Sequence, residues 1–101
     1  PRASHPVIVR HPESGKKLLF VNESFTMYIE NVPRHEGIGV LRMLYQHIQK
    51  PEFCYRFRWE PHSIAFWDNR CMQHYATDDY WPSVRSGFRV QIEGIVPPQA
   101  P

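Results

Sequence analysis

The sequence is poor in cysteine, has no long apolar run and carries almost no net charge. Its two cysteines, Cys54 and Cys71, have the spacing of neither a metal site nor a disulfide framework, so a reducing cytoplasm is the expected compartment. No stretch of 18 apolar residues occurs, and we therefore expect no membrane-spanning helix in this chain. The formal net charge is +2 with dispersed lysines and arginines, which argues against a nucleic-acid partner.

Aromatic side chains and proline are what the chain has in quantity. Aromatic residues make up 14% and hydrophobic residues 42% of the 101 residues, which suits a packed core and argues against disorder throughout. Proline gathers at both ends, and residues 97–101 predict an extended tail that packs on nothing. The length allows one small domain at most, and a start at Pro1 fits a fragment or a processed product.

Two β-prone runs and one helical pattern organise the first half of the chain. Residues 7–10 and 18–21 are rich in branched aliphatic side chains, and the turn-forming stretch between them predicts a hairpin with a longish loop. Residues 34–49 repeat apolar side chains at three- and four-residue steps, which predicts a helix that Pro33 opens and Pro51 stops. The apolar face of this helix consists of Ile38, Leu41, Leu44, Tyr45 and Ile48.

From residue 53 onward the apolar period changes to two, which is typical of strands with one apolar and one polar face. Turns are expected at 60–63 and 68–70, and a loop at 77–82. The four strands that we expect cover residues 53–59, 64–67, 71–75 and 86–93. Many short strands with one helix predict a mainly β fold, a barrel or jelly roll with a covering helix.

The last of these strands carries two arginines. Alternation places Arg85 and Arg89 on one face, across Gly87, and apolar side chains on the other. The two guanidinium groups are then about 13 Å apart, four steps of ~3.3 Å, so they suit two separate anionic groups with room between them. From these residues alone, an edge strand with two ordinary surface arginines stays an open alternative.

The segment from Trp67 to Arg89 resembles the C-terminal signature of the taurine dioxygenase family. Trp67-Asp68-Asn69-Arg70 precedes His74, Tyr75-Ala76 follows it, and arginines stand eleven and fifteen positions beyond the histidine. The resemblance covers about residues 5–94. Its further blocks, in the family's order, are Leu19-Phe20-Val21-Asn22-Glu23, Lys50-Pro51-Glu52-Phe53 and Phe57-Arg58-Trp59.

The resemblance implies an iron(II)- and 2-oxoglutarate-dependent dioxygenase with a double-stranded β-helix (jelly-roll) fold. Residues 1–96 are then the C-terminal part of its catalytic domain. It implies that His74 is the last ligand of a two-histidine, one-carboxylate iron site. It implies further that Arg85 binds the far carboxylate of 2-oxoglutarate, that Arg89 pairs with the anionic head of the substrate, and that Phe25 lines the substrate pocket. The implied substrates are molecular oxygen and a small anion, a sulfonate such as taurine or a sulfate ester. Hydroxylation next to the sulfonate of taurine would release sulfite.

No convincing His-x-Asp motif supplies the other two iron ligands, and the resemblance places that motif upstream. His11-Pro12-Glu13 has facial-triad spacing, but its proline favours a structural turn. We interpret Asp78 and Asp79 as loop polarity, and Asp68 as a corner residue that satisfies backbone donors. Val84 stands where the family often has a second basic residue.

Other hypotheses remain open beside the taurine dioxygenase. One is a related alkylsulfatase or aryloxyalkanoate dioxygenase. Another is a catalytically inactive fragment that serves as a packing or interaction unit, and a third is an anion-binding β-domain that uses Arg85 and Arg89 without metal. A homo-oligomer is left open. A jelly roll cut near its middle exposes strand edges, so we expect the isolated chain to fold poorly unless it is partnered.

Overall fold

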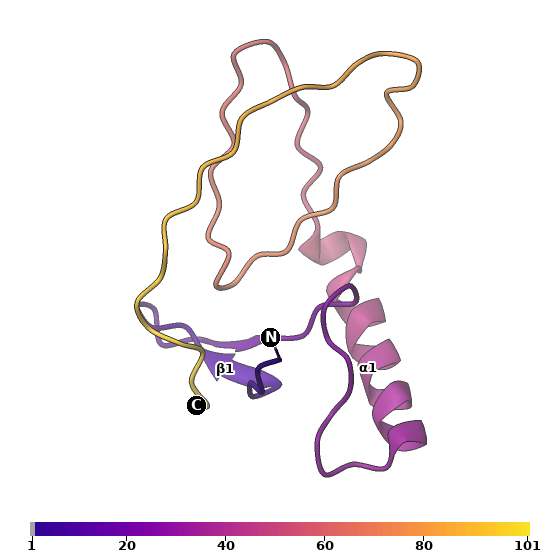
Figure 1. Cartoon of the computed structure of the whole chain (residues 1–101), viewed down its shortest axis with the longest axis vertical. Helices are drawn as coiled ribbons and strands as arrows, with labels where there is room; N and C mark the ends of the chain where they lie inside the picture. The colour runs from indigo at the N-terminus through magenta and orange to yellow at the C-terminus, as the bar shows by residue number, and fades with distance from the viewer. Residues whose placement is uncertain (1) are drawn as a thin grey trace.

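The computed structural model describes residues 2–101, and it shows a small folded base from which two long arms project (Figure 1). The base contains a two-stranded antiparallel sheet, one α-helix and one short 3-10 helix. In chain order these elements are β1 (Ile8–Arg10), β2 (Lys17–Leu19), α1 (Arg34–Ile48) and η1 (Pro51–Phe53).

The hairpin expected in the first 21 residues is confirmed. Ile8 pairs with Leu19, and the ladder continues through Arg10 and Lys17. The loop closes through two backbone hydrogen bonds of 2.9 Å, from His11 N–H to the Lys16 carbonyl and from Gly15 N–H to the His11 carbonyl. Gly15 has φ 69°, a left-handed conformation that glycine adopts without steric cost.

The expected helix is also confirmed, and it begins directly after Pro33, as predicted. The Pro33 carbonyl accepts the N–H groups of Glu36 and Gly37 in the first turn. Leu41 is buried, and three further residues of the expected apolar face are half-buried, whereas Ile38 is 42% exposed. The half-buried residues are Leu44, Tyr45 and Ile48. The buried apolar core of the described residues consists of Val9 from β1, Val21 after β2 and Leu41 from α1.

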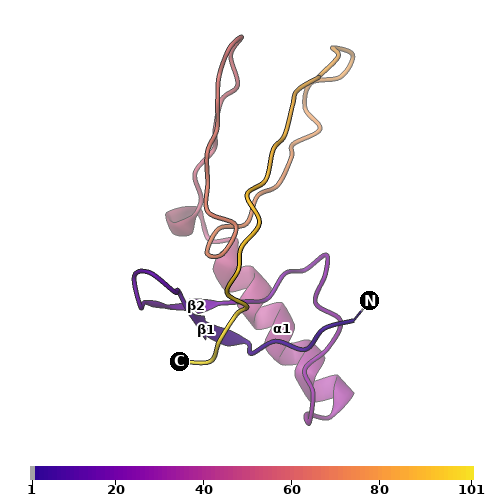
Figure 2. The same ribbon diagram turned by 60° about the vertical axis from the view of Figure 1, so that its left-hand side comes forward.

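The two arms contain none of the four strands that the sequence predicts, so this prediction is wrong for the described chain. The first arm, residues 54–67, and the second arm, residues 72–95, both run away from the base toward the same side (Figure 2). The turn expected at 60–63 is present, closed by Ser63 N–H donating to the Glu60 carbonyl at 3.0 Å.

Strands need partners, and that requirement explains the missing ladders. Side-chain alternation does persist in the first arm, where the rings of Phe57 and Trp59 contact each other at 4.8 Å from the same face. A strand, however, also requires backbone hydrogen bonds to a neighbour, and within residues 54–95 the extended segments do not pair. The period of two therefore predicts extended backbone correctly, while the pairing depends on chain that these residues do not supply.

The C-terminal tail is extended as expected, but it is not unpacked. Arg10 N–H donates to the Gln99 carbonyl at 2.9 Å, which makes an antiparallel bridge between the tail and β1. This correction has a simple cause, because β1 pairs with β2 along one edge and leaves backbone donors on its other edge.

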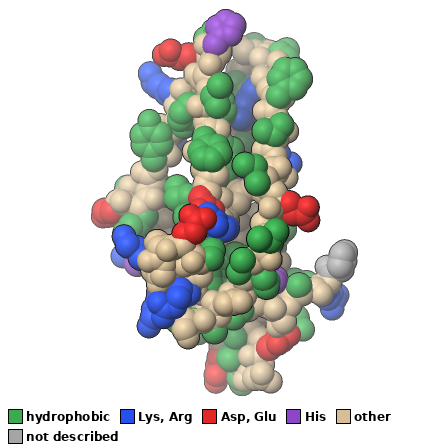
Figure 3. All heavy atoms as spheres, turned by 90° about the vertical axis from the view of Figure 1, so that its left-hand side faces the viewer, with side chains coloured by type: hydrophobic (Ala, Val, Ile, Leu, Met, Phe, Trp, Pro, Cys, Tyr) green, Lys and Arg blue, Asp and Glu red, His purple; other side chains and the backbone are tan. Residues whose placement is uncertain are grey.

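The arms give the chain an open shape. Its radius of gyration is 16.2 Å, whereas a compact domain of this length has about 13 Å. Hydrophobic side chains lie along the arms on the face shown in Figure 3, and Phe88, Val90 and Ile92 are almost fully exposed. Within residues 2–101, no helix has the length and apolar character needed to cross a membrane.

Candidate functional site

His74 lies near the start of the second arm, six residues after the corner at Asp68. Its side chain is exposed, and its ring packs against Trp67 with 5.0 Å between ring centroids and 52° between planes. The Trp67 indole N–H donates to Asn69 Oδ1 at 2.8 Å, which fixes the surface that the imidazole meets. No side chain among residues 2–101 forms a hydrogen bond or ion pair with the His74 ring.

The other residues implied by the resemblance are dispersed. Arg85 and Arg89 lie on the returning half of the second arm, exposed and without a hydrogen bond or ion pair to any described residue. Phe25 is 83% exposed in the turn after β2. None of these side chains lines the hollow beside His11 and Cys71 or the one beside Leu41 and Tyr45. The structure therefore does not gather them into one pocket.

The implied iron site can be tested against the donors present. His74 offers one imidazole that is available to a metal. Within the part of the chain that the structure describes, one group of three potential ligands lies close enough to share an ion, and it does not include His74. It consists of His11, Asp68 and Cys71, whose donor atoms lie within 4.8 Å of one another. The described residues thus offer His74 alone toward the expected iron, and they do not complete its site.

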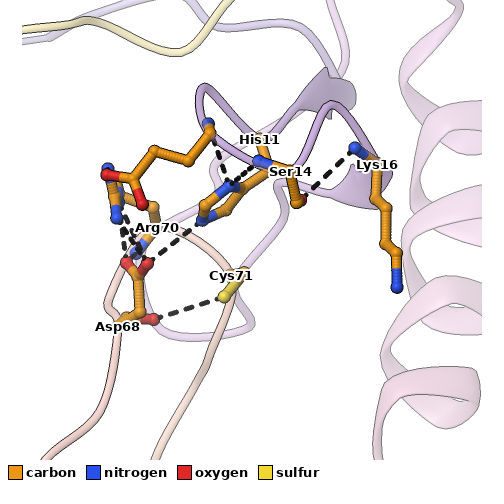
Figure 4. Close-up of polar contacts among 7 residues, drawn as sticks. His11, Ser14, Lys16, Asp68, Arg70 and Cys71 are labelled. Carbon is orange, nitrogen blue, oxygen red and sulfur yellow. Dashed lines mark hydrogen bonds and ion pairs between the residues drawn. The ribbon is translucent and has the colours of Figure 1, made fainter.

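The group around His11 is a hydrogen-bonded network that joins the hairpin loop to the corner between the arms (Figure 4). His11 Nδ1 accepts the backbone N–H groups of Glu13 and Ser14 at 3.3 and 3.1 Å. In the neutral ring the proton must then be on Nε2, which donates to Asp68 Oδ2 at 3.1 Å. The His11 side chain is 11% exposed. The turn expected around His11 is confirmed.

Asp68 receives hydrogen bonds from three directions. Its carboxylate accepts the Arg70 backbone N–H at 2.9 Å and the Arg70 guanidinium, from Nη2 at 2.7 Å and from Nε at 2.9 and 3.1 Å. Arg70 Nη1 also donates to Glu13 Oε1 at 3.1 Å. The interpretation of Asp68 as a corner residue that satisfies backbone donors is confirmed, and its ion pair with Arg70 adds to that role.

These contacts set the protonation of the pair. The Arg70 guanidinium, followed by the His11 ring and the Arg70 backbone N–H, holds the pKa of Asp68 well below its usual range. The Asp68 carboxylate, with help from Glu13, raises the pKa of Arg70 above its already high value. Because both His11 nitrogens and the Asp68 carboxylate are engaged, we assign this cluster to structure rather than to iron.

Gln73 is adjacent to His74, and its contacts were not predicted from the sequence. Its Nε2 donates to the Val21 carbonyl, and its Oε1 accepts Asn22 Nδ2 at 3.2 Å. Gln73 directly precedes His74, so this contact attaches the expected iron ligand to the end of the hairpin. Both segments lie in blocks that carry the family resemblance, but nothing in their sequences signals that they touch.

The relatives of the chain are oxygenases. It is 40% identical over 93% of its length to a Schizosaccharomyces pombe protein that is named, provisionally, as an alpha-ketoglutarate-dependent sulfonate dioxygenase. It is 39% identical over 85% of its length to the alpha-ketoglutarate-dependent sulfonate dioxygenase of Saccharomyces cerevisiae. It is 38% identical over 92% of its length to the alpha-ketoglutarate-dependent sulfate ester dioxygenase of Pseudomonas putida. Alpha-ketoglutarate is 2-oxoglutarate.

The family model described as taurine catabolism dioxygenase TauD, TfdA family matches residues 1–91. The chain therefore belongs to this family, whose fold is the jelly roll. It spans 24%, 21% and 31% of the lengths of the three relatives above. The two-stranded sheet and single helix are consistent with a part of that fold.

Proposed function

We propose that the chain is the C-terminal part of an iron(II)- and 2-oxoglutarate-dependent dioxygenase that hydroxylates a small sulfonate such as taurine and releases sulfite. The observation that carries the proposal is the family match over residues 1–91, which includes His74, Arg85 and Arg89. Relatives named for sulfonates match most of the chain. The exposed free cysteines, Cys54 and Cys71, favour a reducing cytoplasm as its compartment.

His74 is proposed as one iron ligand. A neutral imidazole is a common ligand of iron(II), and this ring has no competing partner among the described side chains. When bound, the iron supplies the activation of oxygen. The other two ligands are proposed to come from a His-x-Asp motif in residues that precede this chain in a longer polypeptide.

Arg85 and Arg89 are proposed to bind the two anions. An extended backbone directs side chains four residues apart to the same face, and Gly87 between them leaves that face open. Each guanidinium can pair with a carboxylate or sulfonate through two parallel hydrogen bonds. Arg85 then holds the far carboxylate of 2-oxoglutarate and Arg89 the sulfonate, while Phe25 supplies an apolar wall beside the substrate carbon.

The test uses the full-length gene product with iron(II), 2-oxoglutarate, oxygen and taurine. Succinate and sulfite should appear in equal amounts, and His74→Ala should abolish both. His47→Ala, on the helix, is the matched control and should leave turnover unchanged. The intact mass is measured first, because a polypeptide of 12.0 kDa would contain only the residues described above. Absence of succinate from a longer, folded product would contradict the proposal.

A sulfate ester is the second candidate substrate. The Pseudomonas putida relative is named for sulfate esters, and an Acinetobacter baylyi relative named alkylsulfatase is 33% identical over 91% of the chain. The products separate the two candidates. Oxidation next to a sulfonate breaks a carbon–sulfur bond and releases sulfite, whereas oxidation next to a sulfate ester breaks a carbon–oxygen bond and releases sulfate.

A further inference from the structure

Apart from local contacts of Cys54, the hydrogen bonds between the base and the described residues 54–95 all involve three residues of the corner, Asp68, Arg70 and Gln73. They join His11 to Asp68, Glu13 to Arg70, and both Val21 and Asn22 to Gln73. In the part of the chain that the structure describes, the rest of residues 54–95 makes no hydrogen bond to residues 2–53. The corner 68–73 is therefore where the base determines the position of the second arm.

We propose that His11, Asp68 and Gln73 form a clasp that positions His74 for metal binding. The inference rests on the proposed function, because it assigns His74 the role of an iron ligand. His11 is a positioning residue here, since it acts through the corner and lies 63 positions before the histidine that it orients.

The His11 end of the clasp is fixed in orientation. Its Nδ1 is held by two backbone N–H groups of the hairpin loop, so the ring cannot turn without breaking both bonds. Its Nε2 therefore points at Asp68, and Arg70 holds the carboxylate from the other side. Because the His11 ring and the Asp68 carboxylate are both held in place, the hydrogen bond between them fixes the distance between the hairpin loop and the corner.

The contacts of the corner in turn determine where His74 lies. The Asp68 carbonyl accepts the N–H groups of Cys71 and Met72 at 3.2 and 2.9 Å, which gives residues 68–72 a helical turn. Gln73 is then tied to the carbonyl of the buried Val21. His74 is the next residue, and its ring lies on Trp67, which directly precedes the corner. Both its backbone and the surface under its ring thus depend on the clasp.

His11 can be changed in two ways that separate its functions. In His11→Asn, the side-chain oxygen can take the place of Nδ1 and keep the loop hydrogen bonds, but it is too short to reach Asp68. In His11→Gln, the terminal amide can take the place of Nε2 and donate to Asp68. His35→Ala is the matched control, because the His35 side chain is 84% exposed.

The experiment compares these variants in the full-length gene product by two measurements. The first is cobalt(II) affinity in the presence of 2-oxoglutarate, followed by visible absorption. The second is amide hydrogen exchange over residues 71–75 in the metal-free protein. We expect His11→Asn to weaken cobalt(II) binding about 10- to 100-fold, the usual cost of losing an outer-shell partner. We expect amide exchange over residues 71–75 to be faster in His11→Asn than in the wild type. His11→Gln should recover most of the cobalt(II) affinity and most of the slow exchange. His35→Ala should match the wild type in both measurements.

Unchanged cobalt(II) affinity in His11→Asn would overturn the clasp while leaving the proposed function intact. Faster exchange throughout the protein, rather than in residues 71–75 and the hairpin loop, would also overturn it, since that result indicates a general loss of structure. If the wild type bound no cobalt(II), the proposed function would fail. The exchange comparison would still decide whether His11 holds the His74 segment.

Discussion

Asp68 is the residue on which the corner depends, and its ionisation should be visible in the acid stability of the protein. Its pKa in the folded chain lies below the ordinary aspartate value of about 3.9 because Arg70, and then His11, stabilise the carboxylate. The unfolded chain therefore takes up this proton at a higher pH than the folded chain does. The stabilisation is complete above the ordinary value and is lost as the pH falls through the lowered one.

We expect Asp68→Asn to reduce the stability of the full-length protein at neutral pH and to flatten its dependence on acid. The amide keeps an acceptor for the Arg70 backbone N–H, so the corner itself can persist. Urea unfolding between pH 6 and pH 2.5 measures the difference between variant and wild type. Glu93→Gln, at an exposed carboxylate on the second arm, is the control. A difference that stays constant over this range would show that the charge of Asp68 contributes nothing.

Arg85 and Arg89 on the second arm should each affect the binding of a different substrate. We expect Arg85→Ala to raise the KM for 2-oxoglutarate and Arg89→Ala to raise the KM for the sulfonate, each about 10- to 100-fold, because a hydrogen bond to a charged group contributes about 1.5–3 kcal/mol. Lysine at either position should recover only part of the loss, since it lacks the planar fork. Steady-state kinetics with each substrate varied in turn measure both constants. Arg42→Ala on α1 is the control, and a rise in the same KM for both variants would contradict the assignment.

At the level of secondary-structure elements, the hairpin and the helix could be predicted because contacts between residues close in the chain stabilise them. The hairpin depends on its turn, where Gly15 adopts a positive φ, and α1 depends on Pro33 and the repeat that buries Leu41. The strands of the arms were not predictable in the same way. Alternation indicates which side chains share a face, as for Phe57 and Trp59, but it carries no information about a partner.

The residues of the candidate site also divide into those that the sequence predicts and those that it does not. His74, Arg85 and Arg89 were found from spacing and resemblance, and they stay proposals because the described chain does not bring them together. The contacts of His11 with Asp68 and of Gln73 with Val21 join residues more than 50 positions apart. No local pattern encodes such contacts, since each residue has an ordinary local explanation as a turn, corner or strand residue.

The glycines of α1 offer a test of how far local propensity governs this element. A Cβ at Gly39 would meet nothing within 4 Å, so Gly39→Ala changes propensity without changing packing. We expect it to stabilise the helix by about 0.5–1 kcal/mol, because alanine loses less backbone entropy than glycine. Circular dichroism at 222 nm of a peptide covering residues 31–53 should show higher helicity. Gly39→Val, with a branched side chain, is the comparison and should gain less; equal or lower helicity in Gly39→Ala would contradict the expectation.

At the scale of the whole molecule, the exposed surface exceeds what a compact chain of this size presents. The accessible area is 9828 Å², against about 6,000 Å² for a folded monomer of 12.0 kDa. Among residues 2–101, three hydrophobic side chains are buried, and the apolar sides of both arms face solvent. An apolar surface of this extent on unpaired extended backbone favours association.

We therefore expect the isolated 101 residues to lack a cooperative unfolding transition, since a transition of this kind requires that most of the chain share one core. Calorimetry should give a broad, weak trace, and size-exclusion chromatography should show aggregates that grow with concentration. The hairpin and α1 should nevertheless persist in part, because their contacts are local, so far-ultraviolet circular dichroism should retain a helical signal. The full-length gene product is the control and should melt sharply. A sharp, concentration-independent transition of a monomeric 12.0 kDa chain would show that the arms find partners within these residues.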